Sequence, residues 1–165
     1  MSITVRPAVP ADADQIARCN LAMASETERK RLDPVIVGAG VRAVLDDPGR
    51  GRYLVAEQEG RIVGQLMLTY EWSDWRNGLF WWIQSVYVEP SARRTGVFRA
   101  LHAHVERLAR ADPGVCGLRL YVERANDRAQ ATYRGCGMHD SGYLVMEVDY
   151  SGAVQSTGGD PHARE

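Results

Sequence analysis

The sequence predicts an α+β domain, because segments with a strand period and segments with a helix period follow one another in separate blocks. A strand and two helices come first, and three strand-like runs then follow with no helix between them. Helices and strands alternate afterwards. The expected elements are, in chain order, strand 3–7, helix 12–24, helix 34–45, strands 53–57, 62–72 and 79–88, helix 97–111, strand 118–122, helix 126–136 and strand 143–150.

The elements of the N-terminal half are predicted from cap and turn residues. Asp12, with Gln15 three residues later, resembles a capping box and predicts a helix start. Asp33 followed by Pro34 gives a cap with proline at the first helical position, which favours a second helix. The pair Glu59-Gly60 lies between two strand-like runs, so we expect a hairpin there.

The elements of the C-terminal half follow from an apolar stripe and from two helix signals. The stripe of the third helix consists of Val97, Leu101, Val105 and Leu108. Asn126 is a typical cap of the fourth helix, and Gly137 is a typical stop. Residues 143–150 alternate and predict a last strand. The Gly/Ser-rich residues 151–165 have no period, so we expect one domain at 1–150 and a disordered tail.

Length and charge indicate one globular domain without an electrostatic attraction for polyanions. The chain has 165 residues, of which 45% are hydrophobic and 25% are charged, and its formal net charge is −1. Such a balance recruits neither nucleic acid nor an anionic membrane, and no long apolar run predicts a membrane span. Lys30 is the only lysine among 20 basic residues, which is typical of a GC-rich bacterial genome.

Cysteine and histidine usage argues against a metal site or a disulfide framework. The three cysteines, Cys19, Cys116 and Cys136, are odd in number and form no CxxC pair. None of the four histidines belongs to a pair with metal-ligand spacing. We therefore expect no metal and a location in the reducing cytoplasm.

The segment 86–101 has the order of a phosphate-binding turn. A β-rich run meets a proline, two arginines and a glycine, and an amphipathic helix begins at once. Free N–H groups of a helix's first turn point at one spot, which the helix dipole makes positive. Gly96 lets the backbone approach a phosphate closely, and Arg93 and Arg94 add permanently charged donors.

Two blocks of the sequence resemble the GNAT N-acetyltransferase family. The first is Arg-x-x-Gly-x-x-x-x-Leu after Val-Tyr-Val-x-Pro, within 86–101, where Phe98 replaces the family's usual Gly or Ala. The second lies within 118–138, where Asn126, Ala129 and Tyr133 match the family positions and Met138 replaces an aromatic residue. The order of the expected elements is also the family's order, so the resemblance covers nearly all of residues 3–150.

The resemblance implies a fold and a cofactor site. The sheet would be mixed and mostly antiparallel, flanked by about four helices, with its fourth and fifth strands splayed apart to admit acetyl-CoA. Backbone groups of the fourth strand would bind the pantetheine arm as an added strand. The residues implied in cofactor binding are Val86, Tyr87, Val88, Arg93, Arg94, Thr95, Gly96, Val97, Phe98, Arg99, Asn126 and Tyr133.

The resemblance also implies a direct attack of an amine on the thioester. The family's tyrosine at the position of Tyr133 commonly donates a proton to the leaving thiolate. Asn126 and Tyr133 are seven residues apart and share a helical face, although a cap and a core residue would explain them equally.

A general base for the amine is the weak point of this mechanism. A free alkylamine has a pKa of about 10, so few molecules are nucleophilic at neutral pH. Many family members carry a glutamate on the fourth strand, and the matching residue here is Gln84, which cannot take a proton. Glu26 and Glu28 are the candidate catalytic carboxylates, with Glu71 and Asp74 as further acidic candidates.

All four tryptophans fall between residues 72 and 82, next to acidic residues. Aromatic faces and carboxylates suit a cationic ligand. The expected acceptor-binding residues are Glu28, Glu71, Trp72, Asp74, Trp75 and Gln84. The aromatic residues could equally pack on the two faces of a strand or line a dimer interface.

From this we expect an enzyme that acetylates a primary amine of a small, polyamine-like or amino-acid-like molecule. Acetylation of a protein or peptide amine is the alternative enzymatic function. An inert acyl-CoA-binding module is the alternative in another class, because Gln84 replaces the usual carboxylate. We further expect a homodimer.

Overall fold

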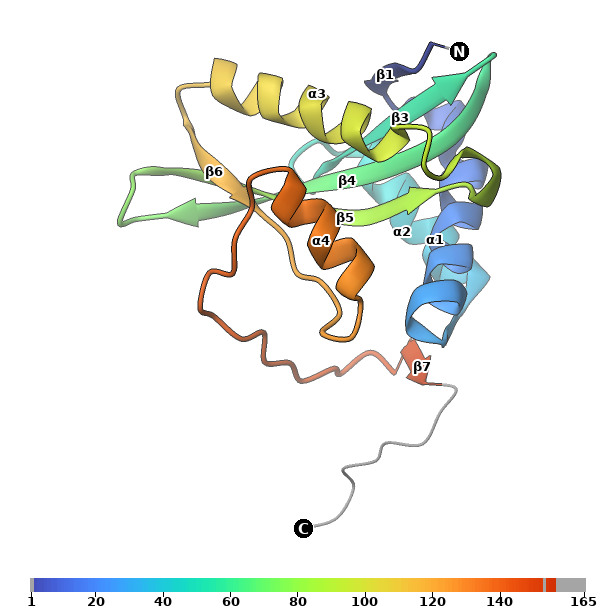
Figure 1. Ribbon diagram of the computed structural model, residues 1–165. Helices are drawn as coiled ribbons and strands as arrows, with labels where there is room; N and C mark the ends of the chain where they lie inside the picture. The colour runs from blue at the N-terminus through green and yellow to red at the C-terminus, as the bar shows by residue number, and fades with distance from the viewer. Residues whose placement is uncertain (1, 153, 157–165) are drawn as a thin grey trace.

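The computed structural model describes residues 2–152 and 154–156 of the chain (Figure 1). The elements are β1 (Thr4–Pro7), α1 (Ala13–Glu28), β2 (Lys30–Leu32), α2 (Pro34–Asp46), β3 (Arg52–Gln58), β4 (Arg61–Ser73), β5 (Gly78–Val88), α3 (Val97–Ala111), β6 (Val115–Arg119), α4 (Asp127–Gly135) and β7 (Val154–Ser156). Short 3₁₀ turns precede α1 and α3.

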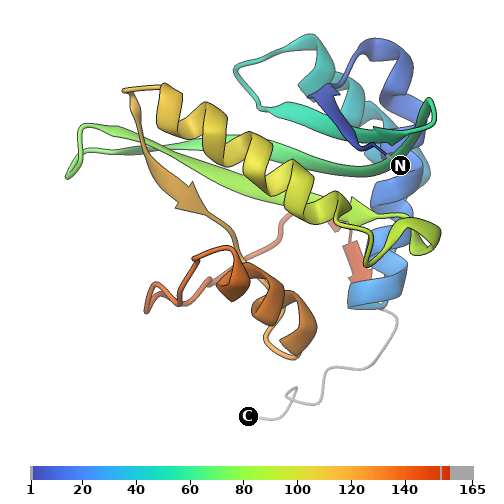
Figure 2. The same cartoon turned by 45° about the horizontal axis from the view of Figure 1, so that its top comes forward.

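The central sheet has the strand order β1-β3-β4-β5-β6. Its first four strands pair antiparallel, and β6 pairs parallel to β5 through the crossover helix α3. Helix α3 covers one face of the sheet and α1 and α2 cover the other (Figures 1 and 2). The expected α+β class and the mixed, mostly antiparallel sheet are therefore confirmed.

Each face of the sheet has its own apolar core, because side chains alternate along each strand. Leu66 and Leu68 of β4 pack with α3 and are fully buried, whereas Met67 between them packs with α1 and α2. In β3, Leu54 points to α3 and Tyr53 to α1. Alternate residues of the same strand thus belong to the two different cores.

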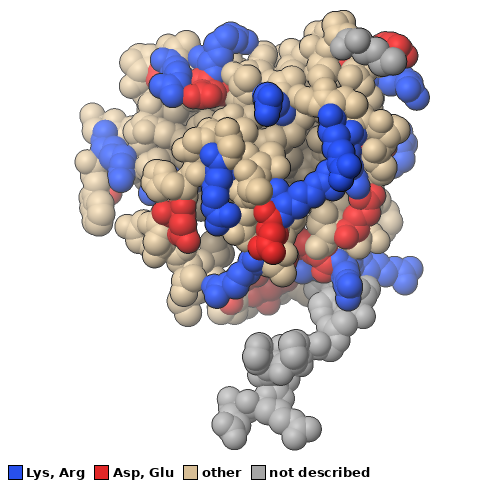
Figure 3. Space-filling model, viewed as in Figure 1, with Lys and Arg blue, Asp and Glu red and all other residues tan. Residues whose placement is uncertain are grey.

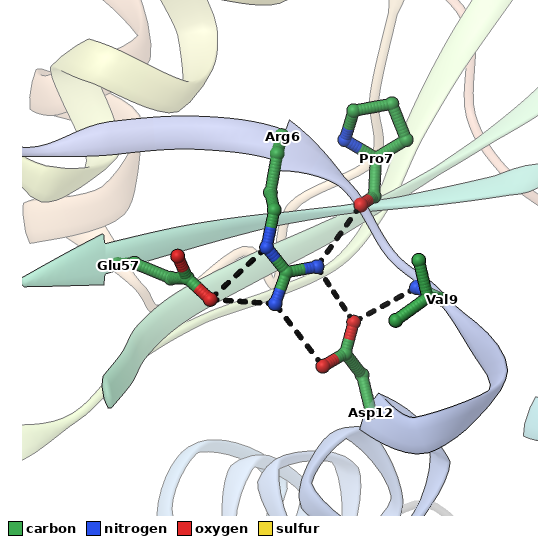
Figure 4. Close-up of polar contacts among 5 residues, drawn as sticks. All are labelled: Arg6, Pro7, Val9, Asp12 and Glu57. Atoms are coloured by element: carbon green, nitrogen blue, oxygen red, sulfur yellow. Dashed lines mark hydrogen bonds and ion pairs between the residues drawn. The ribbon is translucent and has the colours of Figure 1, made fainter. Parts of the chain in front are cut away.

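An arginine cluster joins the N-terminal strand to the start of α1 (Figure 4). The Arg6 guanidinium donates to both oxygens of Asp12, at 2.8 and 3.2 Å, and to Glu57 of β3. The Asp12 carboxylate also accepts the backbone N–H of Val9. These bonds hold the pKa of Asp12 below its usual value, chiefly through Arg6. The cluster fixes β1 against β3 and sets the direction in which α1 leaves the sheet.

The start and the end of α1 differ from the expectation. Asp12 precedes the helix, but its carboxylate binds Arg6 and Val9 and does not cap α1. The helix continues through Glu28 and ends at Arg29 in the left-handed conformation. Residues 25–28, which we expected in a connector, therefore form the last turn of α1. The second helix and the hairpin at Glu59-Gly60 are confirmed.

The C-terminal part departs more from the expectation. Strand β6 begins three residues earlier than expected, and residues 120–122 are not in a strand. The expected strand at 143–150 is wrong, because these residues pair with nothing in the described structure, and Met146 and Tyr150 are more than nine-tenths exposed. Val154–Ser156, where we expected no regular element, form β7, which pairs with β2. The prediction for residues 153 and 157–165 lies outside the described residues.

Candidate cofactor and acceptor site

Strand β5 has two neighbours along its first half only. It pairs with β6 from Leu79 to Trp82, and β6 ends at Arg119 opposite Trp82. From residue 83 onward, β5 pairs only with β4 among the described residues. A gap therefore opens between the two strands where the resemblance implies it.

The backbone of β5 presents hydrogen-bonding groups to this gap. The Glu89 N–H donates to the Val63 carbonyl at 2.9 Å, so Glu89 points toward β4. Because successive residues of a strand point their backbone groups to opposite sides, Val88 points away from β4 into the gap. The Nε atom of Arg93 donates to the Val88 carbonyl at 2.9 Å, which confirms that direction.

A β-bulge lies at the point where β6 departs. Gln84 pairs with Met67 and Tyr87 with Gln65, so β5 carries an extra residue here. Ser85 has a φ of +51°, in the left-handed region. The bulge puts Gln84 and Tyr87 on the same face of the sheet, the one covered by α1, and we call this the acceptor face.

The turn between β5 and α3 has the geometry of an anion site. Gly96 precedes the helix with a φ of +93°, and a Cβ at this position would meet no atom within 4 Å. Val97 is buried, so it can contribute only its backbone N–H, whereas Arg94 and Arg99 are exposed. The Thr95 hydroxyl donates to the Ala92 carbonyl and closes the turn. The free N–H groups at the start of α3 thus face open space.

Arg93 and Glu26 link this turn to α1. The Arg93 guanidinium lies 2.5 Å from the Glu26 carboxylate, which also accepts the Tyr87 hydroxyl at 3.0 Å. The ion pair lowers the pKa of Glu26, chiefly through Arg93. Burial and the nearby Glu26 raise the pKa of Tyr87 to about 12. Glu26 is therefore a firmly ionised carboxylate at the edge of the acceptor face, and a weaker base than an ordinary glutamate.

Helix α4 brings Tyr133 to the start of α3. The rings of Tyr133 and Phe98 meet edge to face with centroids 5.4 Å apart, and burial raises the pKa of Tyr133. The Asn126 side chain accepts the N–H of Ala129 at 3.0 Å, so its oxygen caps α4 as expected. Phe98, which replaces the family's usual Gly or Ala, thus packs against Tyr133.

The expected acceptor residues do not all lie together. Trp72 and Trp75 are 60% and 84% exposed near the tip of the β4–β5 hairpin, which projects beyond the body of the protein (Figure 1). Trp72 pairs with Leu79, five residues before Gln84, so about 16 Å of strand separates it from Gln84. Asp74 lies farther along the same tip and accepts the N–H of Trp75.

Glu71 and Gln84 lie on the acceptor face, but both side chains are engaged. Glu71 accepts the Trp82 indole N–H and pairs with Arg119 at 3.1 Å. These contacts lower the pKa of Glu71, with the Trp82 bond as the largest cause. The Gln84 amide donates to the Thr69 hydroxyl. Neither residue presents a free negative charge to an amine.

Glu28 is the last residue of α1. It pairs with Lys30 at 2.8 Å. A hollow of about 470 Å³ lies beside it, lined by Leu21, Ser25, Arg29, Lys30, Arg31 and Leu32. Figure 3 shows basic and acidic side chains on one face of the protein, which is hollowed between them. Residues from the last turns of α1 and from β2 therefore line this hollow.

Sequence reasoning missed a group of buried polar residues under the bulge. Gln65, Asn20 and Tyr53 come from β4, α1 and β3, and each is at most 9% exposed. Gln65 donates to Asn20, which donates to Tyr53. A glutamine within an alternating strand and an asparagine on the apolar side of a helix were the available signals.

The described residues contain no group of three or more His, Cys, Asp or Glu side chains that could hold a metal ion. No helix in the described part of the chain is long and apolar enough to cross a membrane.

This site belongs to an acyl-CoA-dependent acetyltransferase. Residues 19–138 match the model of the acetyltransferase (GNAT) family, and the chain belongs to that family. No curated protein matches the chain. Among solved structures, a possible acetyltransferase from Clostridium difficile 630 is 43% identical, with a TM-score of 0.84 over 90% of this chain and 98% of that chain.

Two more distant structures share the fold. A ribosomal-protein-alanine N-acetyltransferase from Brucella melitensis biovar Abortus 2308 is 15% identical, with a TM-score of 0.72 over 90% of this chain and 99% of that chain. AAC(6')-Iy in complex with the bisubstrate analogue CoA-S-monomethyl-acetylneamine is 14% identical, with the same TM-score over 90% and 99% of the two chains.

Proposed function

We propose that this protein transfers an acetyl group from acetyl-CoA to a primary amine of a small molecule. The observation that carries the proposal is the half-paired strand β5, followed by a turn that ends in a positive-φ glycine, Gly96, at the start of α3. Tyr133 packs on that same helix turn. These features support a site that combines backbone donors, an anion-binding turn and a phenol.

The residues present fit acetyl-CoA. The open space at Gly96 and the free N–H groups of α3 suit a pyrophosphate, with Arg94 and Arg99 as additional exposed donors. The backbone of Val86 and Val88 suits the amide groups of a pantetheine arm. When bound, acetyl-CoA supplies a thioester whose carbonyl carbon an amine can attack.

Tyr133 is the proposed proton donor. Its phenol would protonate the sulfur that leaves, and the phenol's raised pKa keeps the proton on oxygen at neutral pH. A free thiol has a pKa of about 8.5, so the transfer from a phenol is feasible but not strongly downhill. Asn126 orients the start of α4 and so helps to fix the direction of Tyr133.

The acceptor amine would approach on the acceptor face, beside Gln84. Glu26 and Glu28 are the proposed acidic groups of this side, and both are ion-paired at present. The role we assign to Glu26 is to attract the cationic amine and to accept its proton, directly or through water. The expected pocket at Glu71, Trp72, Asp74 and Trp75 stays a prediction.

An inert acyl-CoA-binding module is the second candidate, because Gln84 cannot act as a base and Glu26 is paired with Arg93. An enzyme that acetylates a protein or peptide amine is the third. Thiol release from acetyl-CoA, measured with a panel of small amines and with peptides, separates the three. Turnover of a small amine supports our proposal, turnover of peptides alone supports the third candidate, and acetyl-CoA binding without any turnover supports the module.

The proposal includes a cytoplasmic homodimer. Three cysteines that form no disulfide, Cys19, Cys116 and Cys136, support a reducing compartment. The exposed indoles of Trp72 and Trp75 support a protein interface at the hairpin tip. Light scattering of the wild-type protein and of a Trp72→Ala, Trp75→Ala variant tests the dimer.

A further inference from the structure

Three buried polar side chains meet beneath the bulge of β5. Gln65 is fully buried, and Tyr53 and Asn20 are 4% and 9% exposed. Burying such groups costs free energy that hydrogen bonds only partly return. Apolar residues would pack this core without that cost, so the polar group calls for an explanation.

The three side chains form one chain of hydrogen bonds. The Gln65 Nε2 atom donates to Asn20 Oδ1 at 2.7 Å, and Asn20 Nδ2 donates to the Tyr53 hydroxyl at 3.2 Å. The Oε1 atom of Gln65 is buried and has no partner among the described residues. The amide is thus kept here at a cost in stability, which argues for a purpose other than stability.

Both ends of this chain reach the bulge residue Ser85. Gln65 Nε2 also approaches the backbone carbonyl of Ser85 at 3.4 Å. The Tyr53 hydroxyl lies near enough to the Ser85 side chain that Ser85, with Asn20, opposes the rise that burial causes in the pKa of Tyr53. Gln65 thus contacts the main chain of Ser85, and Tyr53 lies beside its side chain.

Ser85 needs such support because its conformation is strained. A φ of +51° is unfavourable for a residue with a Cβ atom. The bulge also increases the local twist of β5, at the position where β6 turns away after Trp82. Strain that surrounding contacts maintain at such a point is a typical sign of function.

We propose that Gln65, Asn20 and Tyr53 are positioning residues that hold Ser85 in its left-handed conformation and so keep the gap open before acetyl-CoA binds. The proposal rests on the proposed function. A gap that is already formed spares the cofactor the cost of opening it, which raises affinity without any added contact. The same bonds orient the Ser85 hydroxyl beside Gln84 on the acceptor face.

Calorimetry with acetyl-CoA and the full-length protein tests this proposal. We expect Gln65→Leu and Tyr53→Phe to bind acetyl-CoA about tenfold more weakly, because part of the binding energy must then form the bulge. The control is Val105→Ala, which removes a methyl pair from the core on the α3 face of the sheet, a cluster that contains none of the three residues. It should lose stability but keep its affinity within about threefold.

A rescue variant separates positioning from general damage. Glycine adopts a positive φ without strain, so Ser85→Gly in the Gln65→Leu background should restore affinity to within about threefold of the wild type. A folded Gln65→Leu variant with wild-type affinity would overturn the proposal. So would a double variant that binds no better than Gln65→Leu.

A second measurement does not depend on the cofactor. The backbone amide resonances of Val86 and Tyr87 should shift in Gln65→Leu and return in the double variant, because they report the bulge itself. Unchanged resonances would also overturn the proposal. If the wild-type protein binds no acetyl-CoA, the proposed function fails, and these resonances still decide whether the three residues hold the bulge.

Discussion

The two halves of β5 form a single strand with different partners. From Leu79 to Trp82, β5 has a neighbour on each side, and Glu71, Trp82 and Arg119 tie the three strands together by side-chain bonds. From residue 83 to Val88, one side of β5 is open and a strained serine interrupts the register. The first half holds the sheet together, and the second half leaves its backbone available to a ligand. The contrast shows that a strand without a neighbour on one side can offer its backbone as a binding site.

We expect the largest difference between the two halves of β5 when a proline replaces one residue in each half. The Leu79 N–H donates to the carbonyl of Gly114, the residue just before β6, at 2.8 Å, so Leu79→Pro breaks a bond at the start of the β5–β6 pairing. We expect it to lower the free energy of unfolding by at least about 2 kcal/mol. Val88→Pro removes an N–H that faces the gap and should spare the sheet. Its expected effect is an acetyl-CoA affinity about tenfold lower.

Urea unfolding and calorimetry measure the two effects. If Val88→Pro destabilises the protein as much as Leu79→Pro does, the second half of β5 is also structural and the comparison fails.

Gly96→Glu should abolish most cofactor binding. The new side chain has room, since a Cβ there meets no atom within 4 Å, but its charge opposes a pyrophosphate at the start of α3. We expect acetyl-CoA affinity to fall by about 100-fold or more. Gly96→Ala carries the same backbone strain without the charge and is the control. Equal affinities of the two variants, measured by calorimetry, would show that no phosphate binds here.

Tyr133→Phe tests the proton donor. The ring contact with Phe98 survives, so the fold and the cofactor affinity should remain within about threefold of the wild type. We expect kcat to fall at least about tenfold, because loss of a positioned acid slows departure of the thiolate. Steady-state kinetics at saturating acetyl-CoA checks this. A kcat within about twofold of the wild type, with chemistry rate-limiting, would make Tyr133 a packing residue.

Asp74→Ala should have the smallest effect. Asp74 lies at the hairpin tip beyond Trp72, so we expect the amine KM to stay within about twofold of the wild type. Glu71→Gln on the acceptor face is the matched comparison, since it weakens a bond to Arg119 without moving the strand. A KM that rises several-fold in Asp74→Ala alone would support the cation pocket and extend the functional region to the tip of the β4–β5 hairpin.

Much of the fold could be predicted because it depends on local patterns. The stripe from Val97 to Leu108, the Asp33 cap and the Glu59-Gly60 turn each set an element by short-range chemistry, and each was confirmed. Residues 143–150 show the limit of that reasoning. Alternation predicts a strand only if a partner strand is available, and no local pattern encodes the partner.

The candidate site could be predicted only in part for the same reason. The turn at Gly96 follows from the order of residues in one segment, and the structure has Gly96 in the left-handed conformation at the start of α3. The pairing of Glu26 with Arg93 joins residues 67 positions apart, and the bulge at Ser85 depends on side chains from three elements. Such long-range contacts decide whether a carboxylate is a free base or an ion-pair partner.

Helix α4 is the element that we expect to open most readily by local unfolding. None of its residues is fully buried. The ring of Tyr133 packs against Phe98 of α3. A segment with so little buried apolar surface opens at low free energy, well below that of global unfolding. Amide hydrogens of residues 127–135 should therefore exchange with solvent far sooner than those of Leu66 and Leu68, which lie in the core. The core between α3 and the sheet should stay folded while α4 opens.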